Sequence, residues 1–252
     1  MLKDTEVNRY NLLDTLRGIA LINMVLYHGI WDLVYLFHID WKWYQSITGY
    51  LWQQSICWTF ILLSGFCWSL GKNPIKRGIL ISIGGLLVTI VTICFIPAEK
   101  VIFGVLTLIG SSMLLLVFFR KYLCNIHPIY GIFYTIILFI MTRNINYGYL
   151  GFGQWNCIKL PNFLYKNIVT AYWGFPDKKF YSTDYFSLFP WFFLFLTGYY
   201  LYELCKKKNW LHFFKKTSFR NINQIGRFSL EIYLLHQPIL YIGLNCIFRF
   251  LQ

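Results

Sequence analysis

The stretch Asp14-Thr-Leu-Arg-Gly-Ile-Ala-Leu-Ile-Asn-Met-Val-Leu-Tyr-His28 decides the fold class, because it is long and apolar yet holds ionisable side chains. The apolar pattern extends over residues 10–37, which is enough to cross a bilayer as an α-helix. Eleven residues of α-helix turn about 20° past three full turns and rise about 16 Å, so Arg17 and His28 share one face. Ionisable groups at membrane depth are costly, and a chain that keeps them commonly uses them. This face is predicted to carry the chemistry.

The whole chain has the composition of an integral membrane protein. Hydrophobic residues make up 57% of the 252 residues and charged residues only 13%, which is unlike a soluble domain. We expect an all-α, polytopic helical bundle with about seven or more transmembrane helices, forming a single domain over residues 1–252. The stretches long enough, or nearly long enough, to cross a bilayer are 10–37, 48–70, 78–96, 101–119, 127–142, 185–204 and 226–250. Residues 143–184 are predicted to form a large loop.

The basic residues predict the orientation of the chain. With a cytosolic N-terminus, the connections on the cytosolic side carry more Lys and Arg than those on the outer side, which is the positive-inside pattern. This accounts for the net charge of +13 without a nucleic-acid partner, since no basic patch with a known motif occurs. We expect no cleavable signal peptide, because the first apolar run is too long for one.

The seven cysteines predict neither a disulfide framework nor a metal site. Four fall within apolar stretches, where a thiol is usually a small buried hydrophobe. The sequence holds no CxxC or HExxH signature. We therefore expect no metal cofactor.

The candidate catalytic residues are histidines and a carboxylate. Asp32 follows His28 by four residues and could accept a hydrogen bond from its ring. A histidine oriented by a carboxylate can act as a general base or a nucleophile. The alternative is a satisfied polar pair that holds helices together. His38, at the expected outer boundary, lies where a polar acceptor could approach, whereas His236 in the last apolar stretch is interpreted as a helix-packing residue.

Three arginines at the inner ends of predicted helices are candidates for binding a phosphorylated donor, since the guanidinium fork matches phosphate geometry. For Arg77 and Arg120 we favour the alternative interpretation, contact with lipid headgroups or the positive-inside bias. For Arg17 we favour the functional interpretation, because it lies in the tight segment Asp-Thr-Leu-Arg-Gly. Asp14 is expected to pair with Arg17 or to cap the helix.

The segment Leu13–His28 closely resembles the opening of the catalytic domain of heparan-α-glucosaminide N-acetyltransferase and its small bacterial relatives. Further segments resemble the bacterial branch and occur in the expected order: Phe60–Gly65, Val101–Gly110, Asp184–Trp191 and Gly226–Pro238. The related acyltransferase family 3, which O-acylates surface sugars, carries an arginine, ten intervening residues and a histidine. Arg17 and His28 match that spacing.

The resemblance implies a membrane-embedded acetyltransferase that uses cytosolic acetyl-CoA to acetylate a sugar amine or hydroxyl on the outer side of the membrane. In the lysosomal enzyme the active histidine lies further along, and with a one-residue gap in the comparison it corresponds to His38 in this chain. We rank His28 first and His38 second as the catalytic histidine, with Asp32 orienting the ring. The donor-binding candidates are Arg17, Asp14, Arg77 and Arg120.

Two other function classes are consistent with the same polar stripe. One is a small-solute transporter or channel, against which stand the single polar face and the absence of recognisable inverted repeats. The other is a non-catalytic subunit of an envelope-polysaccharide machine. The expected partners are a carbohydrate acceptor, membrane lipids and further copies of the chain, in the cytoplasmic membrane of a bacterium.

Overall fold

The computed structural model describes residues 10–215 and 219–250, which are mostly helical. The chain divides into two compact units. Unit 1 comprises Met1–Phe60 and Asn209–Gln252, and unit 2 comprises Ile61–Lys208. The first part of helix α2 (Ile47–Trp68) belongs to unit 1 and its second part to unit 2.

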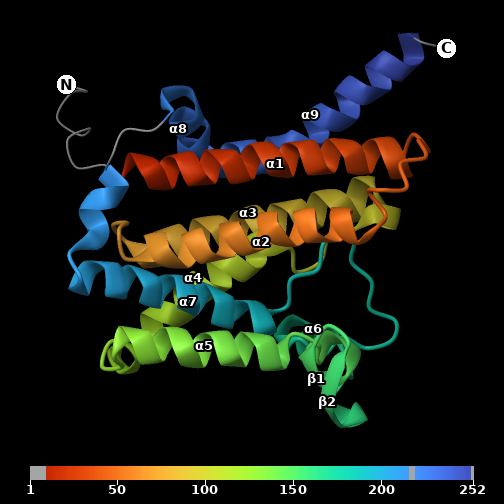
Figure 1. Cartoon of the computed structure of the whole chain (residues 1–252). Helices are drawn as coiled ribbons and strands as arrows, with labels where there is room; N and C mark the ends of the chain where they lie inside the picture. Colours follow the sequence, from red (N-terminus) through yellow and green to blue (C-terminus); the bar gives the residue numbers. More distant parts are fainter. Residues whose placement is uncertain (1–9, 216–218, 251–252) are drawn as a thin grey trace. The chain divides into compact units, whose positions relative to one another are not determined.

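Unit 1 is built around α1 (Asn11–Tyr35), the long helix drawn in red in Figure 1. Its later segments are the short helices η4 (Trp210–Lys215) and α8 (Arg220–Arg227), followed by α9 (Ser229–Phe250). Both α8 and α9 contact α1. The buried core includes Leu21, Met24 and Ile56, with Ile225 and Ile232 packed against it. Apolar residues from both ends of the sequence thus form one core.

Two glycines allow α8 to lie directly against α1. A Cβ at Gly18 would collide with the backbone of Ile222, and a Cβ at Gly226 would collide with the backbone of Asp14. Small residues at a helix contact let two backbones approach closely. This contact brings the first and last segments of the chain together and positions the candidate site.

We expect Gly18→Ala to destabilise unit 1 by about 1–3 kcal/mol, because the added methyl group meets backbone that cannot move aside. Gly243→Ala is the matched control, since Gly243 is also a helical glycine of unit 1 but has open space at its Cβ position. Alanine there should be neutral or mildly stabilising through its higher helix propensity. Thermal unfolding of the purified proteins measures both. Equal effects of the two substitutions would contradict the packing argument.

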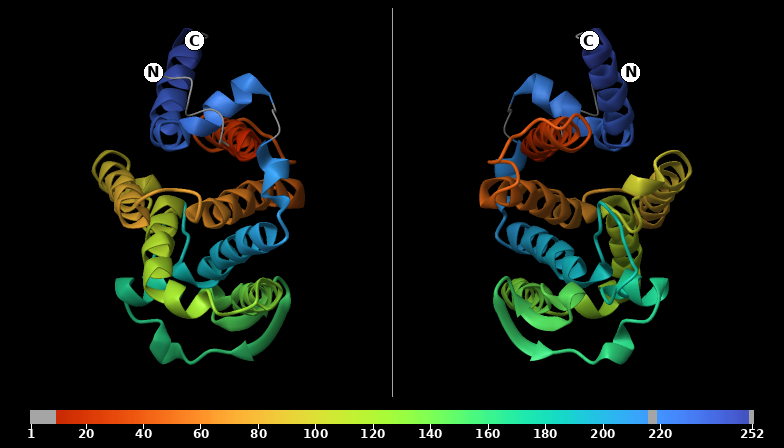
Figure 2. Two further views of the ribbon diagram at one scale, coloured as in Figure 1. Left: turned by 90° about the vertical axis from the view of Figure 1, so that its left-hand side faces the viewer. Right: turned by 90° about the vertical axis from the view of Figure 1, so that its right-hand side faces the viewer.

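Unit 2 surrounds α7 (Leu188–Lys207) with other helices. The long helices are α3 (Pro74–Phe95), α4 (Val105–Leu123) and α5 (Pro128–Thr142). Figure 2 shows α7 enclosed by α4, α5 and the second part of α2. Gly65 of α2 and Gly198 of α7 permit this, since a Cβ at either would collide with the other helix. As a result α7 is the most buried of the five described helices that are long and apolar enough to cross a membrane.

The loop that connects α5 and α7 contains several short helices and a β-hairpin. It holds the short helices η2 (Ile145–Tyr147), η3 (Asn162–Leu164) and α6 (Ile168–Trp173), and an antiparallel hairpin of β1 (Tyr149–Phe152) and β2 (Trp155–Lys159). Figure 1 shows the hairpin at the C-terminal end of α5. A further short helix, η1 (Pro97–Glu99), follows α3. The chain is mostly helical, as predicted, and this short hairpin lies within the predicted loop of residues 143–184.

The protein is a polytopic integral membrane protein. Among the described residues, five segments are long and apolar enough to cross a membrane: Asn11–Tyr35, Pro74–Phe95, Val105–Leu123, Pro128–Tyr147 and Leu188–Lys207. Helices α2 and α9, each of 22 residues, are as long but are not among these five. The count of seven or more spans therefore stays a prediction.

Several boundaries differ from those predicted. The stretch 226–250 is not one helix, because α8 ends at Arg227 and α9 begins at Ser229. The stretch 101–119 becomes helical only at Val105, since Phe103 has a left-handed backbone (φ 58°) and Gly104 is extended. Apolarity alone cannot reveal such backbone breaks.

Candidate functional site

Arg17 and His28 both lie on α1, as the sequence predicted. The helix continues without interruption from Asn11 to Tyr35, so the spacing of three turns between the two side chains holds. Around each of them, side chains from the last segment of the chain contact α1. The result is two polar clusters about 16 Å apart along the axis of one helix.

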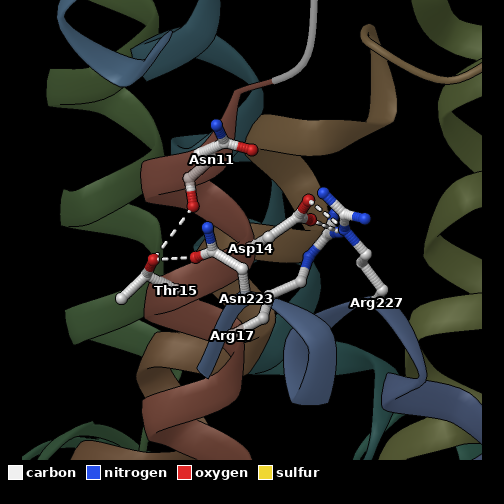
Figure 3. Close-up of polar contacts among 6 residues, drawn as sticks. All are labelled: Asn11, Asp14, Thr15, Arg17, Asn223 and Arg227. Carbon is white, nitrogen blue, oxygen red and sulfur yellow. Dashed lines mark hydrogen bonds and ion pairs between the residues drawn. The ribbon is translucent and has the colours of Figure 1, made fainter. Parts of the chain in front are cut away.

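The first cluster, which we call the Asp14 cluster, consists of Asn11, Asp14, Thr15, Arg17, Asn223 and Arg227 (Figure 3). The Asp14 carboxylate lies 3.4 Å from Arg17 Nη1 and 3.9 Å from Arg227 Nε. The Thr15 hydroxyl donates to the Asn11 carbonyl oxygen at 3.0 Å and contacts the Asn223 side-chain oxygen. Asp14 therefore pairs with Arg17, one of the two roles predicted for it, and ties α1 to α8.

The charges of the Asp14 cluster suit an anion. Two guanidinium groups converge on one carboxylate, which leaves one positive charge uncompensated within the cluster. Both arginine side chains keep roughly a quarter of their surface exposed, 26% for Arg17 and 29% for Arg227. Guanidinium forks with free edges match the geometry of phosphate oxygens. The residues present therefore fit the phosphates of a nucleotide-bearing donor.

Sequence reasoning missed Arg227. It lies in the segment Gly226–Pro238 that carries part of the family resemblance and in the predicted apolar stretch 226–250, but the short polar helix α8 that it ends was not predicted. The signal that could have found it is the glycine directly before it, because Gly226 lets the end of α8 touch the start of α1.

The second cluster, which we call the histidine cluster, consists of His28 and Asp32 on α1 and His236 and Gln237 on α9. The imidazole rings of His28 and His236 have centroids 4.9 Å apart. Gln237 Nε2 donates to Asp32 Oδ1 at 2.6 Å. Asp32 is fully buried, and His236 is 9% exposed. Four polar side chains from opposite ends of the sequence thus meet within the α1–α9 contact.

The histidine cluster corrects the predicted pairing of His28 with Asp32. Among the described residues, the hydrogen bond to the Asp32 carboxylate comes from Gln237 rather than from the His28 ring. The His28 ring instead lies beside the ring of His236, which the sequence analysis interpreted as a helix-packing residue. The physical reason is that α9 packs along α1 and brings its own donor to the carboxylate.

His38 lies apart from the histidine cluster. It follows the end of α1, is exposed, and has a left-handed backbone (φ 57°). Along the axis the end of α1 is about 10 Å beyond His28. The structure therefore brings His28, and not His38, together with Asp32 and His236.

Arg77 and Arg120 belong to unit 2 and meet at Trp68. Arg77 Nη1 donates to the Trp68 carbonyl oxygen at 3.4 Å, and the Arg120 guanidinium lies 5.6 Å from the centre of the Trp68 ring. These contacts hold α2, α3 and α4 at one end of unit 2. Their predicted role in donor binding stays a prediction.

Two of the family-like segments lie side by side in unit 2. The Phe186 backbone N–H donates to the Phe103 carbonyl oxygen at 2.8 Å, and the Ile102 N–H donates to Ser182 Oγ at 2.9 Å. The Asp184 carboxylate accepts a hydrogen bond from the Val105 backbone N–H, at the start of α4. Burial raises the pKa of Asp184 to about 6, and the hydrogen bond from Val105 opposes this shift. The segment before α7 thereby caps α4.

We expect Asp184 to make unit 2 less stable as the pH rises. Its folded-state pKa of about 6 lies above the ordinary value of 3.8, so the folded protein holds this proton more tightly than the unfolded chain. The stabilisation is full below about pH 4 and is lost as the pH rises through 6. Asp184→Asn keeps an oxygen that can accept from the Val105 N–H but has no titrating proton. It should therefore remove this contribution to the dependence of stability on pH. Thermal unfolding of both proteins between pH 4 and 7 tests this, and parallel curves would contradict it.

The comparison with protein families identifies the family of the chain. The family model of the heparan-alpha-glucosaminide N-acetyltransferase catalytic domain matches residues 9–238, which include both clusters and run through both units. No curated protein and no solved structure matches the chain. Because the match covers most of the sequence, this integral membrane protein belongs to the heparan-alpha-glucosaminide N-acetyltransferase catalytic family.

Proposed function

We propose that the protein transfers an acetyl group from cytosolic acetyl-CoA to an amine or hydroxyl group of a sugar on the opposite side of the membrane. The observation that carries the proposal is the arrangement along α1, where an anion-compatible cluster and a histidine cluster lie about 16 Å apart on one helix. Membership of a membrane acetyltransferase family supports the reaction type. The proposal defines the acceptor by its chemical class alone.

Arg17 and Arg227 hold the donor through its phosphates on this proposal. Their partial exposure lets a nucleotide reach them, and Asp14 keeps both guanidinium groups in place. The pantetheine arm is an extended chain of about the length that separates the two clusters. With its phosphates at the Asp14 cluster, the thioester lies beside the histidine cluster.

His28 acts on the reacting groups. It either deprotonates the acceptor or takes the acetyl group on a ring nitrogen before passing it on. In the direct route the acceptor forms a bond to the thioester carbonyl carbon, the C–S bond breaks, and the sulfur leaves with the electron pair and gains the proton. Holding both substrates at one buried place removes much of the entropic barrier.

The sequence supports a proposal for the membrane, the topology and the partners of the protein. We propose a bacterial cytoplasmic membrane, a cytosolic N-terminus, seven or more spans and a single catalytic domain, with a carbohydrate acceptor and lipids as partners and no nucleic acid. Assembly into a homo-oligomer is part of the same proposal. The positive-inside distribution of Lys and Arg supports the orientation.

Binding of acetyl-CoA to the detergent-purified protein tests the proposal against its alternatives. We expect saturable binding that competes with CoA and release of free CoA when glucosamine is added as a probe acceptor. A small-solute transporter or a non-catalytic subunit has no reason to bind this donor. Folded protein that neither binds nor consumes acetyl-CoA would overturn the proposal.

A further inference from the structure

The histidine cluster holds three buried acceptor atoms for which the described residues supply no hydrogen-bond donor. They are His236 Nε2, Gln237 Oε1 and Asp32 Oδ2. Burying a polar atom without a hydrogen-bond partner is costly, so native proteins rarely keep one without a use. Three within one helix contact, all of the acceptor type, indicate a place for a ligand that brings donors.

The hydrogen bonds around His236 fix which of its nitrogens can take a proton. His236 Nδ1 lies 2.6 Å from the Tyr233 carbonyl oxygen, an acceptor, so Nδ1 carries the hydrogen. In the neutral ring Nε2 then holds a lone pair. Its surface is buried and it accepts nothing from the described part of the chain. His236 Nε2 is therefore a preformed proton acceptor.

The orientation of Gln237 is fixed in the same way. Its Nε2 donates to Asp32 Oδ1, and the reverse orientation would point the amide oxygen at the carboxylate. Gln237 Oε1 and Asp32 Oδ2 are thus left as acceptors. The described residues contain no group of His, Cys, Asp and Glu side chains placed to hold a metal ion, so a cation clamped by this cluster is not the occupant that the geometry favours.

We propose that the histidine cluster binds the acceptor substrate, with His236 Nε2 taking its proton and Asp32 and Gln237 accepting its other hydrogen bonds. This rests on the proposed function and deepens it. The substrate class is an amino sugar or a polyol, whose N–H and O–H groups supply the donors that the cluster lacks. An anionic acceptor group is disfavoured beside the Asp32 carboxylate.

The same chemical step applies whether the acetyl group comes directly from the thioester or from an acetylated His28. The acceptor N–H or O–H gives its proton to His236 Nε2, and its lone pair forms the new bond to the acetyl carbonyl carbon. The bond from that carbon to its donor atom, the thioester sulfur or a His28 nitrogen, breaks with the electron pair going to that atom. The proton then passes from His236 to the leaving group. His236 thus takes the role of base that the direct route would otherwise give to His28. His28, whose ring lies beside that of His236, holds or carries the acetyl group.

The test uses the full chain, purified in detergent, with acetyl-CoA as donor and glucosamine as the probe acceptor. His236→Asn is the informative variant, since an asparagine amide can keep the hydrogen bond to the Tyr233 carbonyl but has no group at the position of Nε2. We expect kcat to fall at least about 100-fold, the usual effect of removing a general base, with an unchanged KM for acetyl-CoA. If this variant does not fold, His236→Gln is used in its place, because glutamine fills more of the volume of the ring. The same fall in kcat is expected.

His212→Asn is the matched control. His212 Nδ1 also lies 2.6 Å from a backbone carbonyl three residues earlier, that of Asn209, but the side chain is exposed. Its substitution should leave kcat unchanged. If wild-type protein is active and folded His236→Asn protein has a kcat within about threefold of it, the assignment of His236 is wrong and the proposed function stands. Folded wild-type protein that does not consume acetyl-CoA would overturn both.

Discussion

Replacing His28 by alanine is expected to lower kcat for acetyl transfer by about 10³-fold or more, while binding of acetyl-CoA stays within about threefold of wild type. The loss follows because a general base or nucleophile contributes roughly 10²–10⁴-fold and because His28 lies beside His236 in the histidine cluster. On the proposed function the donor's phosphates bind at Arg17, about 16 Å away, so the substitution should not disturb those contacts. Single-turnover acetyl transfer and equilibrium binding of radiolabelled acetyl-CoA measure the two quantities separately.

His127→Ala is the control for this substitution. His127 is an exposed histidine before α5 in unit 2, where it packs against Tyr130, and it belongs to neither cluster. It should leave both kcat and binding unchanged. Normal turnover by folded His28→Ala would refute the assignment of His28. Loss of both turnover and binding would show that the ring supports the fold rather than the reaction.

The second large effect is expected at the Asp14 cluster. Arg17→Ala should raise the KM for acetyl-CoA about 10- to 100-fold with little change in kcat, since a charge-assisted hydrogen bond contributes roughly 1.5–3 kcal/mol. The fold should persist, because Asp14 keeps Arg227 as a partner. With acetyl-pantetheine, a donor that lacks the nucleotide, wild type and Arg17→Ala should react equally.

The comparison of the two donors makes this prediction specific for phosphate. A structural defect at Arg17 would slow both donors, whereas loss of a phosphate contact slows only the one that carries phosphate. Arg249→Ala is the control, since Arg249 is an exposed arginine at the end of α9 and is expected on the outer side. An equal fall in activity with acetyl-pantetheine would contradict the role of Arg17.

The helices and the face of α1 could be predicted from the sequence because both depend on local patterns. Long apolar runs predict α1, α3, α4, α5 and α7, and the spacing of Arg17 and His28 places them on one face. The family resemblance added the reaction type. These signals lie within single stretches of chain.

The partners of the α1 side chains could not be predicted because they arise from packing between distant segments. Arg227 reaches Asp14 only because Gly18 and Gly226 allow α8 to lie on α1. His236 meets His28 across more than two hundred residues of sequence. A pattern at i and i+4 suggested Asp32 as the partner of His28, yet the tertiary contact brought Gln237 to that carboxylate instead.

The hairpin in the loop of residues 143–184 escaped prediction for a different reason. Its strands are only four and five residues long, and β2 is exposed throughout, so no alternation of apolar and polar residues reveals it. What holds it in place is a side chain, because Asn144 Nδ2 donates to the Gly153 carbonyl oxygen and the Asn156 side-chain oxygen, both at 2.9 Å. Such contacts are visible only in the folded chain.

The central claim, acetyl transfer from one side of a membrane to the other, is tested most directly in sealed proteoliposomes. Radiolabelled acetyl-CoA is supplied outside and glucosamine is trapped inside, with vesicles containing His28→Ala protein alongside. The account predicts that wild-type protein accumulates labelled N-acetylglucosamine in the lumen, while the His28→Ala vesicles do not. Label that stays on external acetyl-CoA with folded wild-type protein, or equal accumulation in both sets of vesicles, would contradict it.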